Sequence, residues 1–166
     1  MWSEPRAAAA ALLLALAGCG FQLRGTADVP FDSVYVAGAS GGVALDLKRS
    51  IQAGTRAKVV EDPKKADAIV DINQAGVQKV ILSLSAGRVR EYRLVYRVGF
   101  RVRDSKGGEY VPQTSIELSR DISFNDSDVL AKESEEGLLI RDMQSDMVQQ
   151  IMRRLAAAQK PKPQVN

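Results

Sequence analysis

Residues 88–103 read RVREYRLVYRVGFRVR, and this stretch carries the strongest periodic signal in the chain. From position 92 onward every even residue is apolar: Tyr92, Leu94, Tyr96, Val98, Phe100 and Val102. Odd positions hold Arg93, Arg97, Arg101 and Arg103, with Val95 and Gly99 between them. Successive side chains of a strand point to opposite faces, so the alternation predicts one long strand with a buried face and a polar face.

Two more strand-like segments flank this strand and are separated from it by tight turns. Residues 68–84 precede it, and Ser85-Ala86-Gly87 forms the intervening turn. Residues 110–124 follow a turn that contains two glycines, and their apolar face is Ile116, Leu118, Ile122 and Phe124. Tight turns join antiparallel neighbours, so the three segments are expected to form an antiparallel meander.

Two amphipathic helices are expected, one before and one after the meander in the sequence. The first covers about residues 42–53, with Ser40 as its expected N-cap and an apolar stripe of Val43, Leu47 and Ile51. The second covers about residues 128–158, and its stripe is Leu139, Met143, Met147, Ile151 and Leu155. Both stripes require a partner surface that removes them from water.

A short strand over residues 33–37 precedes the first helix, and residues 57–61 allow an extra short strand after it. The predicted order is therefore β-α-β-β-β-α. Because a helix buries a stripe and a sheet buries a face, this order predicts an α+β fold. We expect a four-stranded, mostly antiparallel sheet with both helices packed on one face.

The composition excludes several classes of function. The chain has no histidine and one cysteine among 166 residues. Histidine is the commonest general base and metal ligand, so catalytic Ser-His-Asp or Cys-His arrangements are impossible and no metal site is expected. The formal net charge of +3 is too small to demand a nucleic-acid partner. A periplasmic hydrolase is therefore the weakest functional hypothesis.

The first residues have the pattern of a secretory leader. Residues 7–17 are rich in Ala and Leu, and this stretch is shorter than the roughly 20 residues of a membrane-spanning helix. It ends in Leu16-Ala17-Gly18-Cys19, which resembles the lipobox of bacterial lipoproteins. We expect a signal peptide over 1–18, a diacylglycerol and an N-acyl chain on Cys19, and no other cofactor. Asp directly after the lipidated cysteine favours retention in the inner membrane. This chain has Gly20 there, which favours sorting to the outer membrane.

The remaining chain has the length of one domain, expected over residues 19–158 and followed by a disordered tail over 159–166.

The most prominent candidate site of this domain is the arginine face of the central strand. Guanidinium groups bind phosphates and carboxylates, so the face suits an acidic lipid head group or an acidic protein wall. Alternatively, the face is solvated, or Glu117 and Asp121 of the next strand pair with the arginines. Both interpretations remain open.

Arg88 belongs with the arginine face, and two other basic residues, Arg120 and Lys132, are weaker candidates. Arg88 extends the charge of the arginine face toward the first turn. Arg120 interrupts the apolar face of residues 110–124, so its side chain either reaches past the edge to water or points at a ligand. Lys132 lies in the first turns of the second helix, where the helix dipole disfavours a cation. It has a binding role or is an exposed charge without one.

Several short motifs resemble the LptE family of lipopolysaccharide-assembly lipoproteins. The mature chain would begin CGFQLRG at residues 19–25, and Val29-Pro30 follows at the family's distance. The same resemblance extends over residues 90–96, 120–126 and 130–136, so it covers essentially the whole mature chain. Ser123 departs from the pattern, because some members carry an aromatic residue there.

This resemblance implies a non-enzymatic role. Family members plug the lumen of the outer-membrane β-barrel LptD, help it to assemble, and assist delivery of lipopolysaccharide to the outer leaflet. They bind lipopolysaccharide through basic residues, and Lys132 occupies a matching basic position. Arg88, Arg93 and Arg97 are added as lipopolysaccharide or barrel contacts on charge geometry alone.

A different class of interaction protein also fits a lipobox and a small α/β domain. Such a lipoprotein would activate a cell-wall synthase across the periplasm. Its usual signature is a long tether rich in Pro and Gln after the cysteine, whereas structure is expected here from Ser33. The short reach makes this the second hypothesis.

Overall fold

A computed structural model of the chain describes residues 29–38, 40–123 and 129–159. Its elements are β1 (Ser33–Val36), α2 (Gly42–Gly54), β2 (Lys58–Val59), the short 3-10 helix η1 (Pro63–Lys65), β3 (Ala68–Ser85), β4 (Arg88–Arg103), β5 (Glu109–Ser123) and α3 (Val129–Ala156). The predicted signal peptide, Cys19, Phe124 and residues 160–166 of the predicted tail lie outside the described residues.

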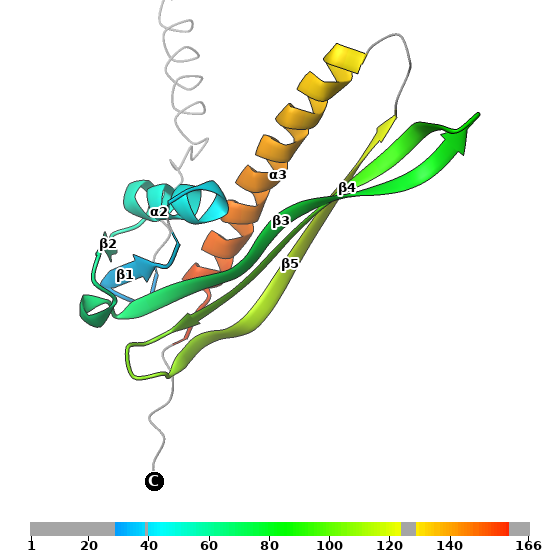
Figure 1. Cartoon of the computed structure of the whole chain (residues 1–166). Coiled ribbons are helices and arrows are strands. Elements are labelled where there is room, and N and C mark those ends of the chain that lie inside the picture. The colour runs from blue at the N-terminus through cyan, green and yellow to red at the C-terminus, as the bar shows by residue number, and fades with distance from the viewer. Residues whose placement is uncertain (1–28, 39, 124–128, 160–166) are drawn as a thin grey trace, which may run out of the picture.

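The predicted α+β fold is confirmed. The strands form one mixed sheet in the order β2-β1-β3-β4-β5, in which β1 is parallel to β2 and β3. The three long strands form the predicted antiparallel meander. The sheet has five strands instead of four because the short segment allowed after the first helix forms β2. Figure 1 shows α2 and α3 on the same side of the sheet, with β3 and β4 extending as a long twisted ribbon beyond α2.

β4 organises the hydrophobic core from the middle of the sheet. Its six even-numbered side chains from Tyr92 to Val102 are all at most 6% exposed. They pack with the buried stripes of both helices: Val43, Leu47 and Ile51 from α2, and Met143, Met147, Ile151 and Leu155 from α3. Neither described helix is long and apolar enough to cross a membrane. The stripes predicted from sequence are therefore the surfaces that hold the helices on the sheet.

The predicted capping of the first helix by Ser40 is wrong. α2 is preceded by Gly41 in extended conformation, and no side chain hydrogen-bonds to its first turn. Ser40 belongs to the turn before it, where its N–H donates to the Gly38 carbonyl at 2.8 Å. At the other end Thr55 closes the helix, because its N–H and its hydroxyl both donate to the Ile51 carbonyl.

We predict that the stability of the domain depends on the buried face of β4 and not on the outer end of the β3–β4 hairpin. Leu94 is fully buried, so Leu94→Ala should lower the free energy of unfolding by about 2–5 kcal/mol. Leu84→Ala is the matched control, because Leu84 is 62% exposed and its truncation should change stability by less than about 0.5 kcal/mol. Urea unfolding measures both, and equal losses would contradict the assignment of the core.

Candidate functional site

Four arginines of β4, at odd positions from 93 to 103, lie on the sheet face that neither helix covers, and they contact polar side chains of the neighbouring strands. Arg93 forms a two-pronged ion pair with Asp121 of β5, with Nε–Oδ1 at 2.6 Å and Nη2–Oδ2 at 2.8 Å. Arg97 pairs with Glu117 of β5 and donates to Gln78 of β3 at 2.8 Å. Both acids stand directly opposite their arginines in the strand register.

Asp71 of β3 binds the other two arginines. Its Oδ2 accepts a hydrogen bond from Arg101 Nε at 3.0 Å and from Arg103 Nε at 2.8 Å. We call the set of Arg93, Arg97, Arg101 and Arg103 with Asp71, Glu117 and Asp121 the arginine ladder. Because each of these arginines has a carboxylate partner on the sheet, the self-paired interpretation describes their geometry. Contact of Arg93 and Arg97 with an external partner stays a prediction.

Asp71 is the least exposed acid of the ladder, with 17% of its side chain accessible. Burial alone would raise its pKa, but hydrogen bonds from Arg103 and Arg101 outweigh burial and hold the pKa below its ordinary value of 3.8. Because the pKa of Asp71 is lower in the folded state than in the unfolded state, its ionised form stabilises the protein at pH values above the ordinary pKa. This contribution is lost as the pH falls through the lowered pKa. The exposed pairs contribute less, since water screens them.

We predict that Asp71→Asn lowers the free energy of unfolding by about 1–2 kcal/mol at pH 7, because two guanidinium groups lose their charged acceptor. The difference from the wild type should shrink as the pH falls below about 4, because the Asp71 carboxylate is then protonated first in the unfolded chain and, at lower pH, in the folded one. Urea unfolding between pH 3 and pH 7 measures this. Glu117→Gln is the control, because the Glu117 side chain is 51% exposed and its loss should cost less. A pH-independent difference would contradict the assignment.

Polar side chains in the middle of α3 hydrogen-bond to other elements of the fold. Arg120 lies on the helix side of β5, and its Nη2 donates to Asp146 of α3 at 3.1 Å. The sequence left open whether the Arg120 side chain reaches water or points at a ligand. In the structure α3 supplies an acidic partner for it. Gln144 of α3 donates to Asp46 of α2 at 2.6 Å and so joins the two helices.

A polar cluster fastens the N-terminal part of α3 to the ribbon, and sequence analysis missed it. Glu136 accepts from Lys79 Nζ of β3 at 2.8 Å and from the Tyr92 hydroxyl of β4 at 2.7 Å. The Lys79 ammonium also lies 5.3 Å from the centre of the Tyr92 ring. Burial raises the pKa of the Tyr92 hydroxyl, and the Glu136 hydrogen bond raises it further. Periodicity identifies a helix face, but it does not show which strand residue that face meets.

The predicted contact residues fall into two groups. Arg93 and Arg97 belong to the arginine ladder. Arg88 is an exposed residue that begins β4 beside the turn, and Lys132 lies in the first turns of α3, where its Nζ is 2.7 Å from Glu135 Oε2. Figure 1 shows the start of α3 and the β3–β4 turn at the same end of the molecule. Arg88 and Lys132 therefore share one end, away from most of the ladder.

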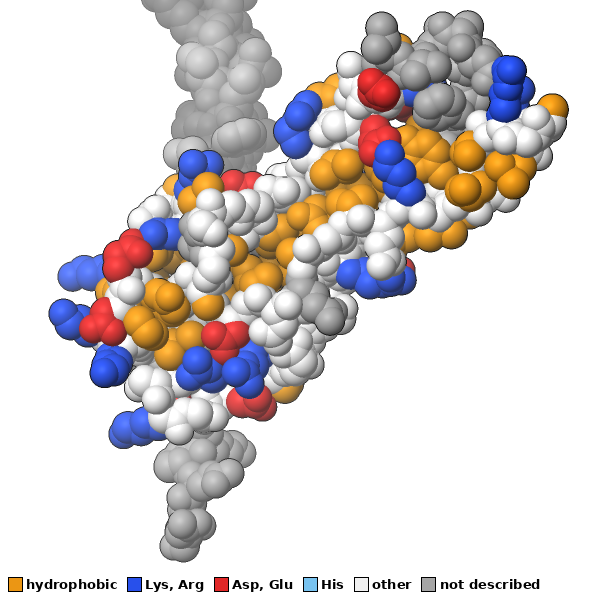
Figure 2. All heavy atoms as spheres, viewed as in Figure 1, with side chains coloured by type: hydrophobic (Ala, Val, Ile, Leu, Met, Phe, Trp, Pro, Cys, Tyr) orange, Lys and Arg blue, Asp and Glu red, His pale blue; other side chains and the backbone are white. Residues whose placement is uncertain are grey.

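The same end carries exposed aliphatic side chains that sequence analysis missed. We call them the hairpin-end patch: Val80, Ile81, Leu82 and Leu84, which are 46%, 55%, 40% and 62% exposed. Figure 2 shows hydrophobic side chains in a band that runs from the core, between α3 and the strands, to this end of the molecule. Three consecutive apolar residues at 80–82 break the alternation of a half-buried strand, and this break was the available signal.

The irregular backbone of the hairpin explains why this patch is exposed. The register between β3 and β4 shifts twice near the turn, so that the strand pairing skips Leu82 of β3 and then Arg90 of β4. Val80 stands opposite Arg93 on the ladder face, whereas Ile81 stands opposite Tyr92 on the helix face. At the turn, Ala86 and Gly87 both have positive φ angles, 51° and 75°. The ribbon therefore ends with aliphatic side chains on both of its faces.

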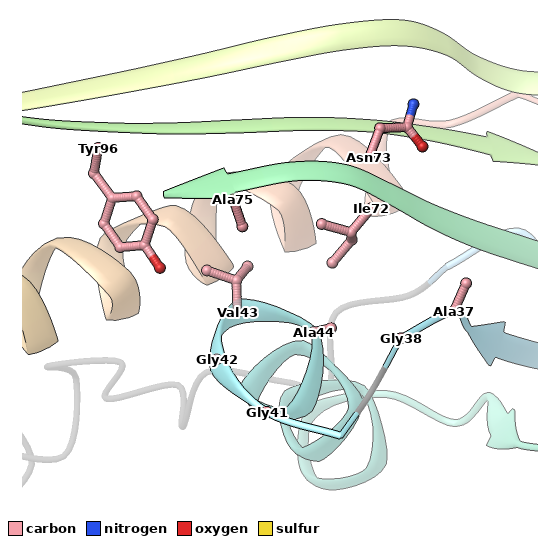
Figure 3. Close-up of a pocket in the computed structure, with 10 residues that line it drawn as sticks. All are labelled: Ala37, Gly38, Gly41, Gly42, Val43, Ala44, Ile72, Asn73, Ala75 and Tyr96. Carbon is pink, nitrogen blue, oxygen red and sulfur yellow. The ribbon is translucent and has the colours of Figure 1, made fainter. Parts of the chain in front are cut away.

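A cavity of about 340 Å³ lies at the start of α2, between the β1–α2 loop and β3. Figure 3 shows the Tyr96 ring extending from the strands toward Val43, while the Asn73 amide points away from α2. Asn73 donates instead to Gln113 of β5. The described lining is glycine backbone, small aliphatic groups and these two polar side chains, without a charged group. We therefore assign no chemistry to this cavity.

Solved structures define the class of protein to which this fold belongs. The chain is 45% identical to the solution structure of a lipoprotein B from Nitrosomonas europaea, with a TM-score of 0.72, covering 83% of this chain and 91% of that one. The rare lipoprotein B of Shewanella oneidensis has the same fold at 23% identity, with a TM-score of 0.63 and coverage of 75% and 92%. The class is an α+β lipoprotein domain with two helices on one sheet face.

Sequence comparison identifies the family within this class. The family model LptE, described as lipopolysaccharide-assembly, matches residues 28–155. The LPS-assembly lipoprotein LptE of Yersinia enterocolitica is 30% identical over 148 residues, which is 86% of this chain and 70% of that protein. The protein of the same name from Pectobacterium atrosepticum is 26% identical and is covered over 79% of its length. The chain belongs to the LptE family, so the resemblance found in the sequence is confirmed.

Proposed function

We propose that this protein is a non-enzymatic outer-membrane lipoprotein that plugs the LptD β-barrel, assists its assembly and helps to deliver lipopolysaccharide to the outer leaflet. The observation that carries the proposal is the match of the LptE model to residues 28–155, nearly all of the domain. Lipid on Cys19 would anchor the chain. Nine residues lie between Cys19 and Val29, and the ten Cα-to-Cα steps of such a segment reach at most about 36 Å when extended.

The shape and charge of the domain are compatible with a position inside a barrel. The ribbon of β3, β4 and β5 forms a long, narrow body with α3 lying along it (Figure 1). Its helix-free face presents the arginine ladder, in which every arginine is paired with a carboxylate and Asp71 serves two of them. Such a face can meet a hydrated polar wall without burying an unpaired charge. We assign Arg93 and Arg97 to barrel contact, and Arg88 and Lys132 to lipopolysaccharide contact.

Purification of the lipidated, tagged chain from detergent-solubilised outer membrane tests the plug. We expect a near-stoichiometric partner that migrates faster on a gel when unheated, as a folded β-barrel does, and normally after heating. Lipopolysaccharide should be found in the same fraction. Recovery of the lipoprotein alone, or with a cell-wall synthase, would overturn the proposal and leave the family assignment intact.

We predict that Lys132→Gln reduces the lipopolysaccharide bound by the lipidated chain about tenfold, the loss expected for one charged hydrogen bond. Lys132 is partly exposed and pairs with Glu135 in the first turns of α3, so its replacement should not unfold the domain. Titration with lipopolysaccharide in a neutral detergent measures the change. Lys132→Arg is the matched control and should retain binding. Equal affinity of Lys132→Gln and the wild type would remove Lys132 from the site.

A further inference from the structure

The hairpin-end patch has a composition that suits a particular ligand chemistry. Its four side chains are all aliphatic, and they lie on an extended segment of five residues, about 16 Å long. Protein interfaces favour Trp, Tyr and Arg at their energetic centres and under-use Leu and Val. An acyl chain needs only aliphatic surface without directional partners. The patch therefore matches an acyl chain better than a protein partner.

The outer hairpin itself carries an excess of basic residues, two of which pair with acids of other elements: Lys79 with Glu136 of α3, and Arg93 with Asp121 of β5. Residues 77–93, which form the outer hairpin, contain Lys79, Arg88, Arg90 and Arg93 but only one acid, Glu91. Lys79 is 56% exposed at its side chain, even though it contacts Glu136. A ligand with acyl chains and negatively charged head groups would be complementary to both the aliphatic surface and its basic surroundings. An uncharged lipid would use only half of these features.

The hydrophobic band supports this assignment because the helix-face part of the patch, where Ile81 stands opposite Tyr92, continues the core, while Val80 lies on the ladder face. Val77 of β3 precedes the patch by three residues, and Val89 of β4 stands opposite Leu84; both are partly buried against the core. Glu136 binds Lys79 and Tyr92 where the band leaves the core. Aliphatic surface thus extends outward from the core along the hairpin, as Figure 2 shows. An acyl chain lying there would prolong the packing of the domain.

We infer that the hairpin-end patch, Val80, Ile81, Leu82 and Leu84, binds acyl chains of the lipid A part of lipopolysaccharide. This inference rests on the proposed function and adds the part of the ligand that the outer hairpin contacts. Basic residues would hold phosphate groups, while the patch would shield hydrocarbon from water. Binding would then depend on apolar area as well as on charge.

Ile81→Ser combined with Leu84→Ser tests the inference in the lipidated full-length chain. The pair should weaken binding of fluorescent lipid A about tenfold or more, because two exposed aliphatic contacts are lost. Its affinity for the deacylated sugar bisphosphate of lipid A should not change. Ile81→Leu with Leu84→Ile keeps the aliphatic surface and should bind lipid A normally. Val80→Ser with Leu82→Ser gives an independent variant of the same patch.

Leu138→Ser is the matched control for exposure. Leu138 is 61% exposed, close to the 62% of Leu84. It follows Glu136 by two residues in α3, so it lies about 200° around the helix and points away from the ribbon. This variant should bind lipid A as the wild type does. A loss equal to that of Ile81→Ser with Leu84→Ser would show a general effect of exposed leucine and overturn the inference.

The remaining outcomes separate this inference from the proposed function. If the serine variants bind lipid A normally but no longer co-purify with the barrel, the patch is a protein contact and the inference fails. Equal competition by phosphatidylglycerol would also overturn it, because the ligand would then be any anionic lipid. If the wild type lacks a barrel partner but its lipid A binding still requires Ile81 and Leu84, the inference stands and the plug fails.

Discussion

The packing of the even-numbered side chains of β4 against α2 and α3 is the contact on which the rest of the structure depends. β4 pairs with β3 on one side and with β5 on the other, so it sets the register of the whole meander. Burying Leu94, Val98 and Phe100 on the helix side removes apolar surface from water and forces every odd-numbered residue to the opposite face. The arginine ladder is therefore a geometric consequence of the core.

Once the register is set, the arginines stabilise it in a second way. Arg93 meets Asp121 and Arg97 meets Glu117 directly across the β4–β5 pair. A slip by one residue would place the odd-numbered arginines in the core and separate them from these acids. Each exposed pair contributes little in water, but all of them favour the same register. Apolar burial thus selects the face, and charge pairing helps to select the alignment.

The sequence predicted those features that depend on local periodicity. The bounds of β4, Arg88–Arg103, follow from the two turns that enclose it, its buried face follows from the alternation after position 92, and the stripes of α2 and α3 follow from four-residue spacing. Features that depend on how two elements meet were not predictable in this way. Parity placed Arg93 on the ladder face but left its partner open, and nothing local placed Glu136 beside Tyr92. The prediction of Ser40 as the N-cap was wrong because more than one residue of the turn before α2 can occupy an N-cap position. In the structure Gly41 occupies it.

The outer hairpin is the place where local features oppose stability. Ala86 has a left-handed backbone conformation that is unfavourable for a residue with a Cβ atom. The register shifts at Leu82 and Arg90 interrupt the regular pairing of β3 with β4. Aliphatic side chains remain in water there although the core lies only a few residues away. A domain selected for stability alone would have polar side chains at these positions. Strain, irregular register and exposed aliphatic surface coincide at one end, as expected where a surface is kept for a ligand and not for the fold.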